Sequence, residues 1–181
     1  MKPLLLFEGV TLWRGGRLLF EGLDLRLGPG EALHVTGPNG SGKSSLIRLA
    51  AGLLRAQAGR VERTSVALSD DALALDRELP LRQALGFWAA EAGMEAMGLS
   101  ALAGVPVRLL SSGQAKRATL ARVAASGAIL WLLDEPLNAL DADGAARLDA
   151  LLASHRAKGG AVLAASHGAL AGDWARLELA Q

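Results

Sequence analysis

The stretch that decides the fold is "ALHVTGPNGSGKSSLIRLAAGLL", residues 32–54. It opens with a short apolar run that is typical of a buried strand. From Ser44 it continues in a helical pattern whose apolar positions extend to Leu54. Between the two, residues 37–44 match the pattern G-x-x-x-x-G-K-S of a phosphate-binding loop. A strand before this loop and a helix after it are the context in which the pattern binds phosphate, because the helix N-terminus then faces the anion.

The glycine, lysine and serine residues of this loop each suit phosphate binding for a chemical reason. Glycines allow backbone amides to approach phosphate closely and to adopt unusual dihedral angles. Lys43 is expected to reach the outer phosphates of a nucleotide and to assist catalysis, and the Ser44 hydroxyl is expected to bind Mg²⁺. The predicted phosphate-binding residues are Gly37, Pro38, Asn39, Gly40, Ser41, Gly42, Lys43, Ser44 and Ser45.

Two further apolar runs end in residues that suit catalysis. In "ILWLLDEP", residues 129–136, Asp134 is expected to hold Mg²⁺, and Glu135 to orient or deprotonate a water molecule. His167 ends "AVLAASH", a run expected to lie beside the strand of the phosphate loop, so it is predicted near the terminal phosphate. Without the loop upstream, both runs would be ordinary strand ends. His34 and His155 are interpreted as structural.

A second glycine-containing turn, "LSSGQ" at residues 110–114, precedes a basic helical pattern. By itself it is a helix N-cap, with Ser111 as the capping residue. Gly113, however, lets the backbone approach an anion, and the turn lies in a chain that already has a complete phosphate loop. An intervening helical insert separates the two turns. We therefore expect a second copy of the chain, with nucleotide held between the turn of one copy and the loop of the other.

Composition sets the limits of this interpretation. The 181 residues suit one domain with a sizeable core. With 19 basic and 18 acidic side chains, the formal charge of +1 gives no reason to expect nucleic acid as a partner. The absence of cysteine excludes thiolate metal sites. Hydrophobic residues make up 51%, but the longest apolar run, 123–133, is too short for a membrane span, so a separate protein must hold the chain at any membrane.

The order of elements predicts an α/β fold. Residues 4–13 and 18–27 have strand-like spacing around Gly15-Gly16 and predict an antiparallel hairpin. Residues 60–71 are interpreted as one strand, 71 to about 105 as a helical insert in which Pro80 opens a helix, and 174–181 as a final edge strand. Strands that alternate with helices indicate a mostly parallel sheet with helices on both faces. The small helical subdomain is expected over about 71–123.

The motifs "GPNGSGKSS", "LSSGQ", "LLDEP", "NALD" and a final "SH", in this order, resemble those of the ATP-binding subunits of ABC transporters. The resemblance covers nearly the whole chain and implies one P-loop NTPase domain, residues 1–181, that hydrolyses ATP with Mg²⁺. It also implies a head-to-tail dimer with Ser111, Gly113 and Gln114 at the partner's nucleotide, the loop 138–141 beside the interface, and His167 as the switch histidine. Multi-span permease subunits would hold the dimer at the cytoplasmic face of a bacterial inner membrane.

Within this family the chain is similar to the haem-exporter ATPases of cytochrome c maturation. The similar segments are "RGGRLLFEGLDL" at 14–25, "LIRLAAGLL" at 46–54 and the run with Trp131 before the acidic pair. This resemblance implies haem export or haem handling by the complex, since the chain has no obvious pair of haem ligands. The alternatives are another cargo or a non-transport member of the superfamily. A P-loop kinase has no need of "LSSGQ".

Three departures from the family pattern stand out. The aromatic residue expected against adenine is Trp13, or the stacking group is Arg14. Ser69 and Asp70 occupy the region of a glutamine that the family usually has, and Asp70 is a candidate for binding Mg²⁺ through water. Ser112 replaces the usual second glycine of "LSSGQ". In the insert, Phe87 and Trp88 belong either to a docking surface for the permease or to the core.

Overall fold

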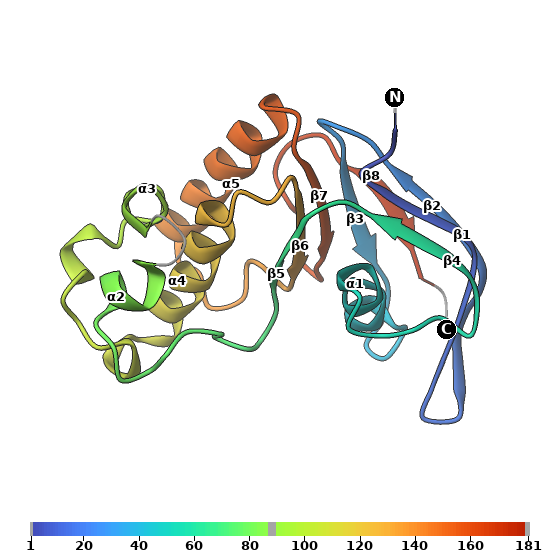
Figure 1. The fold of residues 1–181 in the computed structure, drawn as a ribbon, viewed down its shortest axis with the longest axis horizontal. Coiled ribbons are helices and arrows are strands. Elements are labelled where there is room, and N and C mark those ends of the chain that lie inside the picture. The colour runs from blue at the N-terminus through green and yellow to red at the C-terminus, as the bar shows by residue number, and fades with distance from the viewer. Residues whose placement is uncertain (1, 87–89, 180–181) are drawn as a thin grey trace.

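The computed structural model describes residues 2–86 and 90–179, and it contains two sheets with helices between and beside them (Figure 1). The antiparallel sheet has the order β2-β1-β4, from β1 (Leu5–Arg14), β2 (Arg17–Leu27) and β4 (Ala58–Arg63). The parallel sheet has the order β5-β6-β7-β3-β8, from β3 (Ala32–Thr36), β5 (Val66–Ser69), β6 (Leu130–Asp134), β7 (Ala161–Ala165) and β8 (Ala175–Glu178). The predicted P-loop NTPase class, with its mostly parallel sheet and antiparallel N-terminal part, is confirmed.

The hairpin prediction is confirmed, and so is the final edge strand. Strands β1 and β2 pair antiparallel and close at Arg14 and Arg17 around Gly15 and Gly16, which have φ angles of 59° and 77°. Glycine suits both positions, because positive φ at two consecutive residues is unfavourable for other side chains. Strand β8 lies at the edge of the parallel sheet beside β3.

The prediction of one strand over residues 60–71 is wrong. The segment forms the end of β4, which pairs with β1, and then β5, which pairs with β6 in the other sheet. The chain crosses between the sheets at Thr64 and Ser65. Residues 60–71 contain no glycine or proline, so the sequence contains no strong turn signal at this crossing.

The helices are α1 (Lys43–Ala51), α2 (Leu81–Leu85), α3 (Ala90–Ala96), α4 (Ser112–Ala125) and α5 (Ala142–Ala157), with short 3-10 turns at Ser100–Leu102 and Val107–Leu109. Helix α1 ends before Leu54, contrary to the sequence pattern. Gly52, at φ 80°, donates its N–H to the Leu49 carbonyl and closes the helix, and Leu53 is 62% exposed. Phe87 and Trp88 lie outside the described residues.

Two apolar cores lie on the two faces of the parallel sheet. All five residues of β6 are buried and alternate between them: Leu130 and Leu132 face one core, and Trp131 and Leu133 face the other. The first core includes α1 and the antiparallel sheet, and the second includes α4 and α5. Figure 1 shows α2 and α3 beyond α4, at the end of the molecule away from the antiparallel sheet. None of the helices in the described part of the chain has the length and apolar character that a membrane crossing requires.

His155 packs against the second core, away from the candidate site. Its ring stacks on Trp131 with centroids 3.7 Å apart, and its Nε2 lies 3.2 Å from the Ile129 carbonyl. Burial lowers the pKa of His155, with a smaller contribution from the charge of Lys158, while hydrogen bonds to the Ile129 and Ala161 backbone partly offset this. His34, in contrast to the partly exposed His155, is buried, with Nε2 3.1 Å from the Ser166 carbonyl.

The depressed pKa of His155 predicts acid destabilisation. In the unfolded chain this group protonates near its ordinary pKa, about 6.5, whereas the folded chain resists protonation to lower pH. Acid therefore favours the unfolded state as pH falls through about 6.5. Chemical denaturation between pH 7.5 and 5.5 should show a smaller loss of unfolding free energy for His155→Phe, which keeps a ring on Trp131, than for the wild type. Equal losses would contradict this assignment.

Candidate functional site

The phosphate loop joins β3 to α1 and folds around two glycines that no other residue can replace without strain. Gly42 precedes α1 with φ 102°, which orients the first turn of the helix. A Cβ at Gly37, which has φ 141°, would lie 2.5 Å from the Leu179 carbonyl oxygen. Lys43 is buried, and its ammonium donates to the carbonyls of Gly37 and Pro38 at 2.8 and 3.0 Å. The loop thus holds the Lys43 ammonium against two of its own carbonyl groups.

Asp134 ends β6 at the carboxyl edge of the parallel sheet. It is 4% exposed, and its Oδ1 has no hydrogen-bond partner among the residues that the structure describes. Burial raises the pKa of Asp134, and a hydrogen bond from the Ser44 hydroxyl partly offsets this. A buried carboxylate oxygen left unpaired beside a serine hydroxyl forms an oxygen donor set of the kind that Mg²⁺ prefers. These two residues therefore fit the predicted metal ion.

Glu135 and His167 meet at the ends of β6 and β7. The Nε2 atom of His167 lies 3.6 Å from Glu135 Oε1, and its backbone N–H donates to Glu135 Oε2 at 3.4 Å. The predicted neighbourhood of β7 and the loop strand β3 is confirmed, because the two pair in parallel. Glu135 has φ 45°, a left-handed conformation that is unfavourable for a residue with a side chain. Such strain is typical of positions whose direction matters for function.

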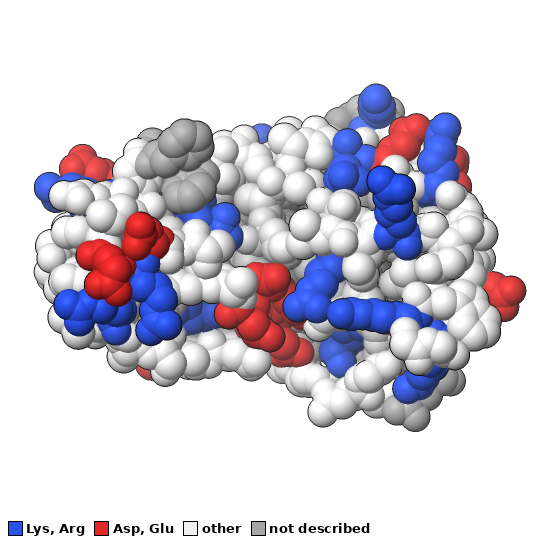
Figure 2. All heavy atoms as spheres, turned by 60° about the horizontal axis from the view of Figure 1, so that its bottom comes forward, with Lys and Arg blue, Asp and Glu red and all other residues white. Residues whose placement is uncertain are grey.

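The phosphate loop, Glu135 and His167 share one cavity of about 590 Å³. The face in Figure 2 shows acidic side chains gathered at its middle and basic side chains beside them. The cavity is lined by Asn39, Gly40, Gly42, Lys43, Ser44 and Ser45 from the loop and α1, by Glu135, Asn138 and His167 from the sheet edge, and by Arg14, Arg17 and Leu19 from the hairpin. The structure therefore brings the phosphate loop, a carboxylate and an imidazole together with two guanidinium groups.

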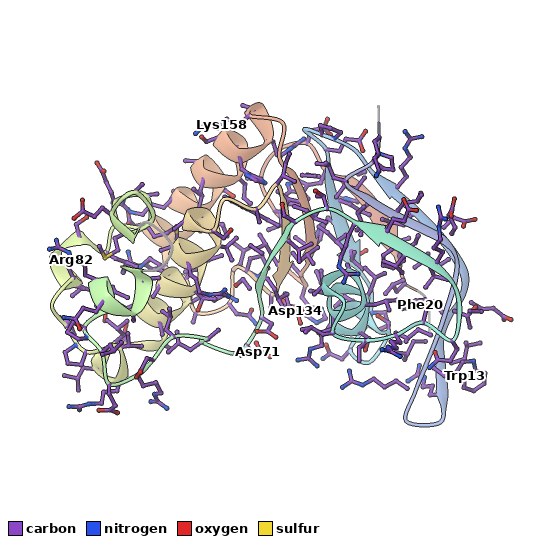
Figure 3. The ribbon with its side chains drawn as sticks, viewed as in Figure 1. Trp13, Phe20, Asp71, Arg82, Asp134 and Lys158 are labelled. Carbon is purple, nitrogen blue, oxygen red and sulfur yellow. The ribbon has the colours of Figure 1, made fainter. Side chains whose placement is uncertain are left out.

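Several predicted residues do not line this cavity. Gly37, Pro38, Ser41 and Asp134 are not among its lining residues, and Ser41 and Asp134 are buried. Trp13 is 50% exposed on β1 and is not among the lining residues, and in Figure 3 it lies at the hairpin, away from Asp134.

Of the two candidates for the adenine-stacking group, it is Arg14 that lines the cavity, where its Nη1 donates to Ser45 Oγ at 3.1 Å. Sequence analysis missed Arg17 and Leu19. The two arginines that flank Gly15-Gly16 could have indicated that this turn faces an anionic ligand.

The second turn also lies outside the cavity, and its residues contact their own chain. Ser111 and Gln114 form a capping box: Gln114 N–H donates to Ser111 Oγ at 3.2 Å, and Ser111 N–H donates to Gln114 Oε1 at 2.9 Å. A Cβ at Gly113 would lie 2.7 Å from the Ala139 carbonyl oxygen. The turn therefore packs on the loop 138–141, with Ser111 and Ser112 exposed to solvent.

The cavity predicts that Arg14, rather than Trp13, contacts the base of a bound nucleotide. Arg14→Ala should raise the KM for ATP by about 3–10-fold, the size expected for losing one guanidinium contact with an aromatic ring. Trp13→Ala is the matched control and should leave the KM near that of the wild type. Steady-state hydrolysis by both variants tests this, and a larger effect of Trp13→Ala would reverse the assignment.

Comparison with known proteins identifies the family. The family model described as ABC transporter matches residues 20–138. A "Cytochrome c biogenesis ATP-binding export protein CcmA" from Sphingopyxis alaskensis is 58% identical over 94% of this chain and 93% of its own length. A protein of the same name from Novosphingobium aromaticivorans is 56% identical over 87% of this chain and 85% of its own length.

Solved structures show the same fold at lower identity. The ATP-binding subunit of an ABC transporter superposes with a TM-score of 0.83 at 20% identity, over 91% of this chain and 79% of its own. An ABC transporter ATP-binding protein from Pyrococcus furiosus superposes with a TM-score of 0.84 at 18% identity, over 97% of this chain and 96% of its own. The chain therefore belongs to the ABC transporter family as an ATP-hydrolysing subunit, and within that family to the cytochrome c biogenesis ATP-binding export proteins.

Proposed function

We propose that this subunit couples ATP hydrolysis to haem export or haem handling in the biogenesis of c-type cytochromes. The observation that carries the ATPase part is the meeting of the phosphate loop with Glu135 and His167 in one cavity. The names of relatives that match almost the whole chain support the cytochrome c part. In this proposal haem is handled by the complex, as the sequence has no obvious pair of haem ligands.

In this proposal the loop binds the phosphates of ATP. Its backbone amides and the Lys43 ammonium stabilise negative charge on the outer phosphates. Ser44 and Asp134 would hold Mg²⁺, which would supply charge neutralisation at the β- and γ-phosphates. Arg14 contacts the base at the hairpin end of the cavity, and Arg17 adds positive charge there.

Glu135 is the proposed catalytic carboxylate. Its position beside His167 suits a pair in which Glu135 orients and deprotonates water while His167 contacts the γ-phosphate. The two residues follow neighbouring strands that pair in parallel: Glu135 comes one residue after β6, and His167 comes two residues after β7. This preorganisation is the main way in which protein groups accelerate phosphoryl transfer.

A head-to-tail dimer completes each site. The capping box leaves the N-terminal end of α4 exposed at Ser111 and Ser112, and the partial positive charge of a helix N-terminus attracts phosphate. Ser111, Gly113 and Gln114 of one subunit would then face the nucleotide on the phosphate loop of the other. The loop 138–141 would lie beside this interface, as its contact with Gly113 suggests.

Permease subunits of the membrane are the proposed further partners. We propose that residues 1–181 form one ABC-type domain, with a helical subdomain over about 71–123 that docks on the permease. The subunit would then be peripheral, at the cytoplasmic face of the bacterial inner membrane.

Glu135→Gln tests the catalytic proposal. Loss of one preorganised catalytic group should lower turnover by roughly 10²–10³ while ATP binding persists. The variant should therefore accumulate as an ATP-bound dimer in size-exclusion chromatography with light scattering. Glu95→Gln, on the exposed side of α3, is the matched control and should turn over ATP like the wild type. A Glu135→Gln protein that stays monomeric with ATP would refute the dimer.

Affinity purification from membranes tests the cargo proposal. Tagged Glu135→Gln protein, purified from its own membranes in ATP, should bring down multi-span proteins of cytochrome c maturation, and haem should be detectable in the complex by its absorbance. Recovery of an unrelated permease would remove haem from the proposal and leave the ATPase. Recovery of soluble partners alone would overturn the role in transport.

A further inference from the structure

The peptide group between Asp134 and Glu135 is held at both ends. Its N–H donates to the Ala165 carbonyl at 2.8 Å. Its carbonyl oxygen accepts a hydrogen bond from the Lys116 ammonium at 3.2 Å. Glu135, which follows this peptide directly, has the unfavourable φ of 45°. An unfavourable backbone conformation persists only where surrounding contacts determine it, and these two hydrogen bonds do so from opposite sides.

Lys116 is a partly buried lysine with aspartates close by. It is half-buried in a second cavity of about 290 Å³, which Asp70, Asp71 and Asn138 also line. Burial lowers the pKa of Lys116, while the negative charges of Asp71, Asp134, Asp70 and Glu135 partly offset this. Asn138 lines both cavities, so Lys116 reaches the catalytic edge of the sheet from behind. In Figure 3, Asp71 and Asp134 lie near each other at this edge.

Contacts of helix α4 with its neighbours fix the position of Lys116. Further along the same helix, Arg122 donates to the Leu68 carbonyl of β5 at 2.6 Å. Near its start, Arg117 forms an ion pair with Asp143 at the beginning of α5, at 3.3 Å. The helix is thus attached to the ends of two neighbouring strands and to α5. Because the helix is held in place, the Lys116 ammonium stays within hydrogen-bond distance of the Asp134 carbonyl. A lysine on a mobile surface segment would not be held there.

We propose that Lys116 is a positioning residue for hydrolysis: it holds the Asp134–Glu135 peptide so that the Glu135 carboxylate points into the nucleotide cavity. This inference rests on the proposed catalytic role of Glu135. Lys116 does not contact the nucleotide or the attacking water. Without its ammonium the peptide can rotate, and Glu135 relaxes away from His167 toward a more favourable φ.

Lys116→Met tests this proposal, because methionine keeps an unbranched side chain of similar length and removes the charge. The kcat for ATP should fall by about 10–100-fold, the size expected when a catalytic group is misplaced by about 1 Å. The KM for ATP should stay within about twofold of the wild type, since the phosphate loop is untouched. Lys116→Arg, which restores a donor, should recover part of the loss. Lys158→Met is the control, since Figure 3 shows Lys158 on the side of the molecule opposite Asp134.

A double-mutant cycle separates positioning from general damage. If Lys116 acts through Glu135, Lys116→Met should cost little further turnover in single-turnover assays when Glu135 is already glutamine. An equal loss in both backgrounds, or unchanged kcat in the single variant, would overturn the inference while leaving the ATPase proposal intact. Full activity of Glu135→Gln alone would instead refute the catalytic role on which the inference depends.

Discussion

The register between β6 and β7 is the constraint on which the site depends. Asp134 pairs with Ala165, and all five residues of each strand are buried. A slip by one residue would turn every side chain of the strand to the opposite core, so the two-sided burial fixes the register. Because β3 pairs with the other side of β7, the phosphate loop begins at the same edge where Glu135 and His167 meet.

The same sheet explains why the two turns stay apart within one chain. Helix α1, which follows the phosphate loop, packs into the core that the antiparallel sheet covers. Helix α4, which follows the second turn, packs into the core on the other face. The exposed capping box at Ser111 therefore lies outside the cavity of its own chain. In the proposed dimer, this turn would face the nucleotide of the second subunit, and each subunit would contribute to two sites.

Sequence patterns predicted the parts of the site that are local in the chain. The phosphate loop, the carboxylate pair after β6 and the histidine after β7 each follow from a strand end and a short motif. Other features depend on neighbours far along the chain. Lys116 reaches a carbonyl 18 residues away, and Arg14 rather than Trp13 lines the cavity because adjacent residues of a strand point to opposite faces. The crossing at Thr64 and Ser65 depends on which sheet each half of the segment joins, and no glycine or proline in residues 60–71 marks it.

Site-directed cross-linking tests the central claim most directly, because the natural sequence contains no cysteine. One chain would carry Asn39→Cys in the phosphate loop and another Ser111→Cys in the second turn, both at exposed positions. With ATP and a mild oxidant, the mixed chains should form a disulfide-linked dimer, and either variant alone should not. Equal cross-linking with and without ATP, or its absence in the mixture, would contradict the account of two turns that meet only between subunits.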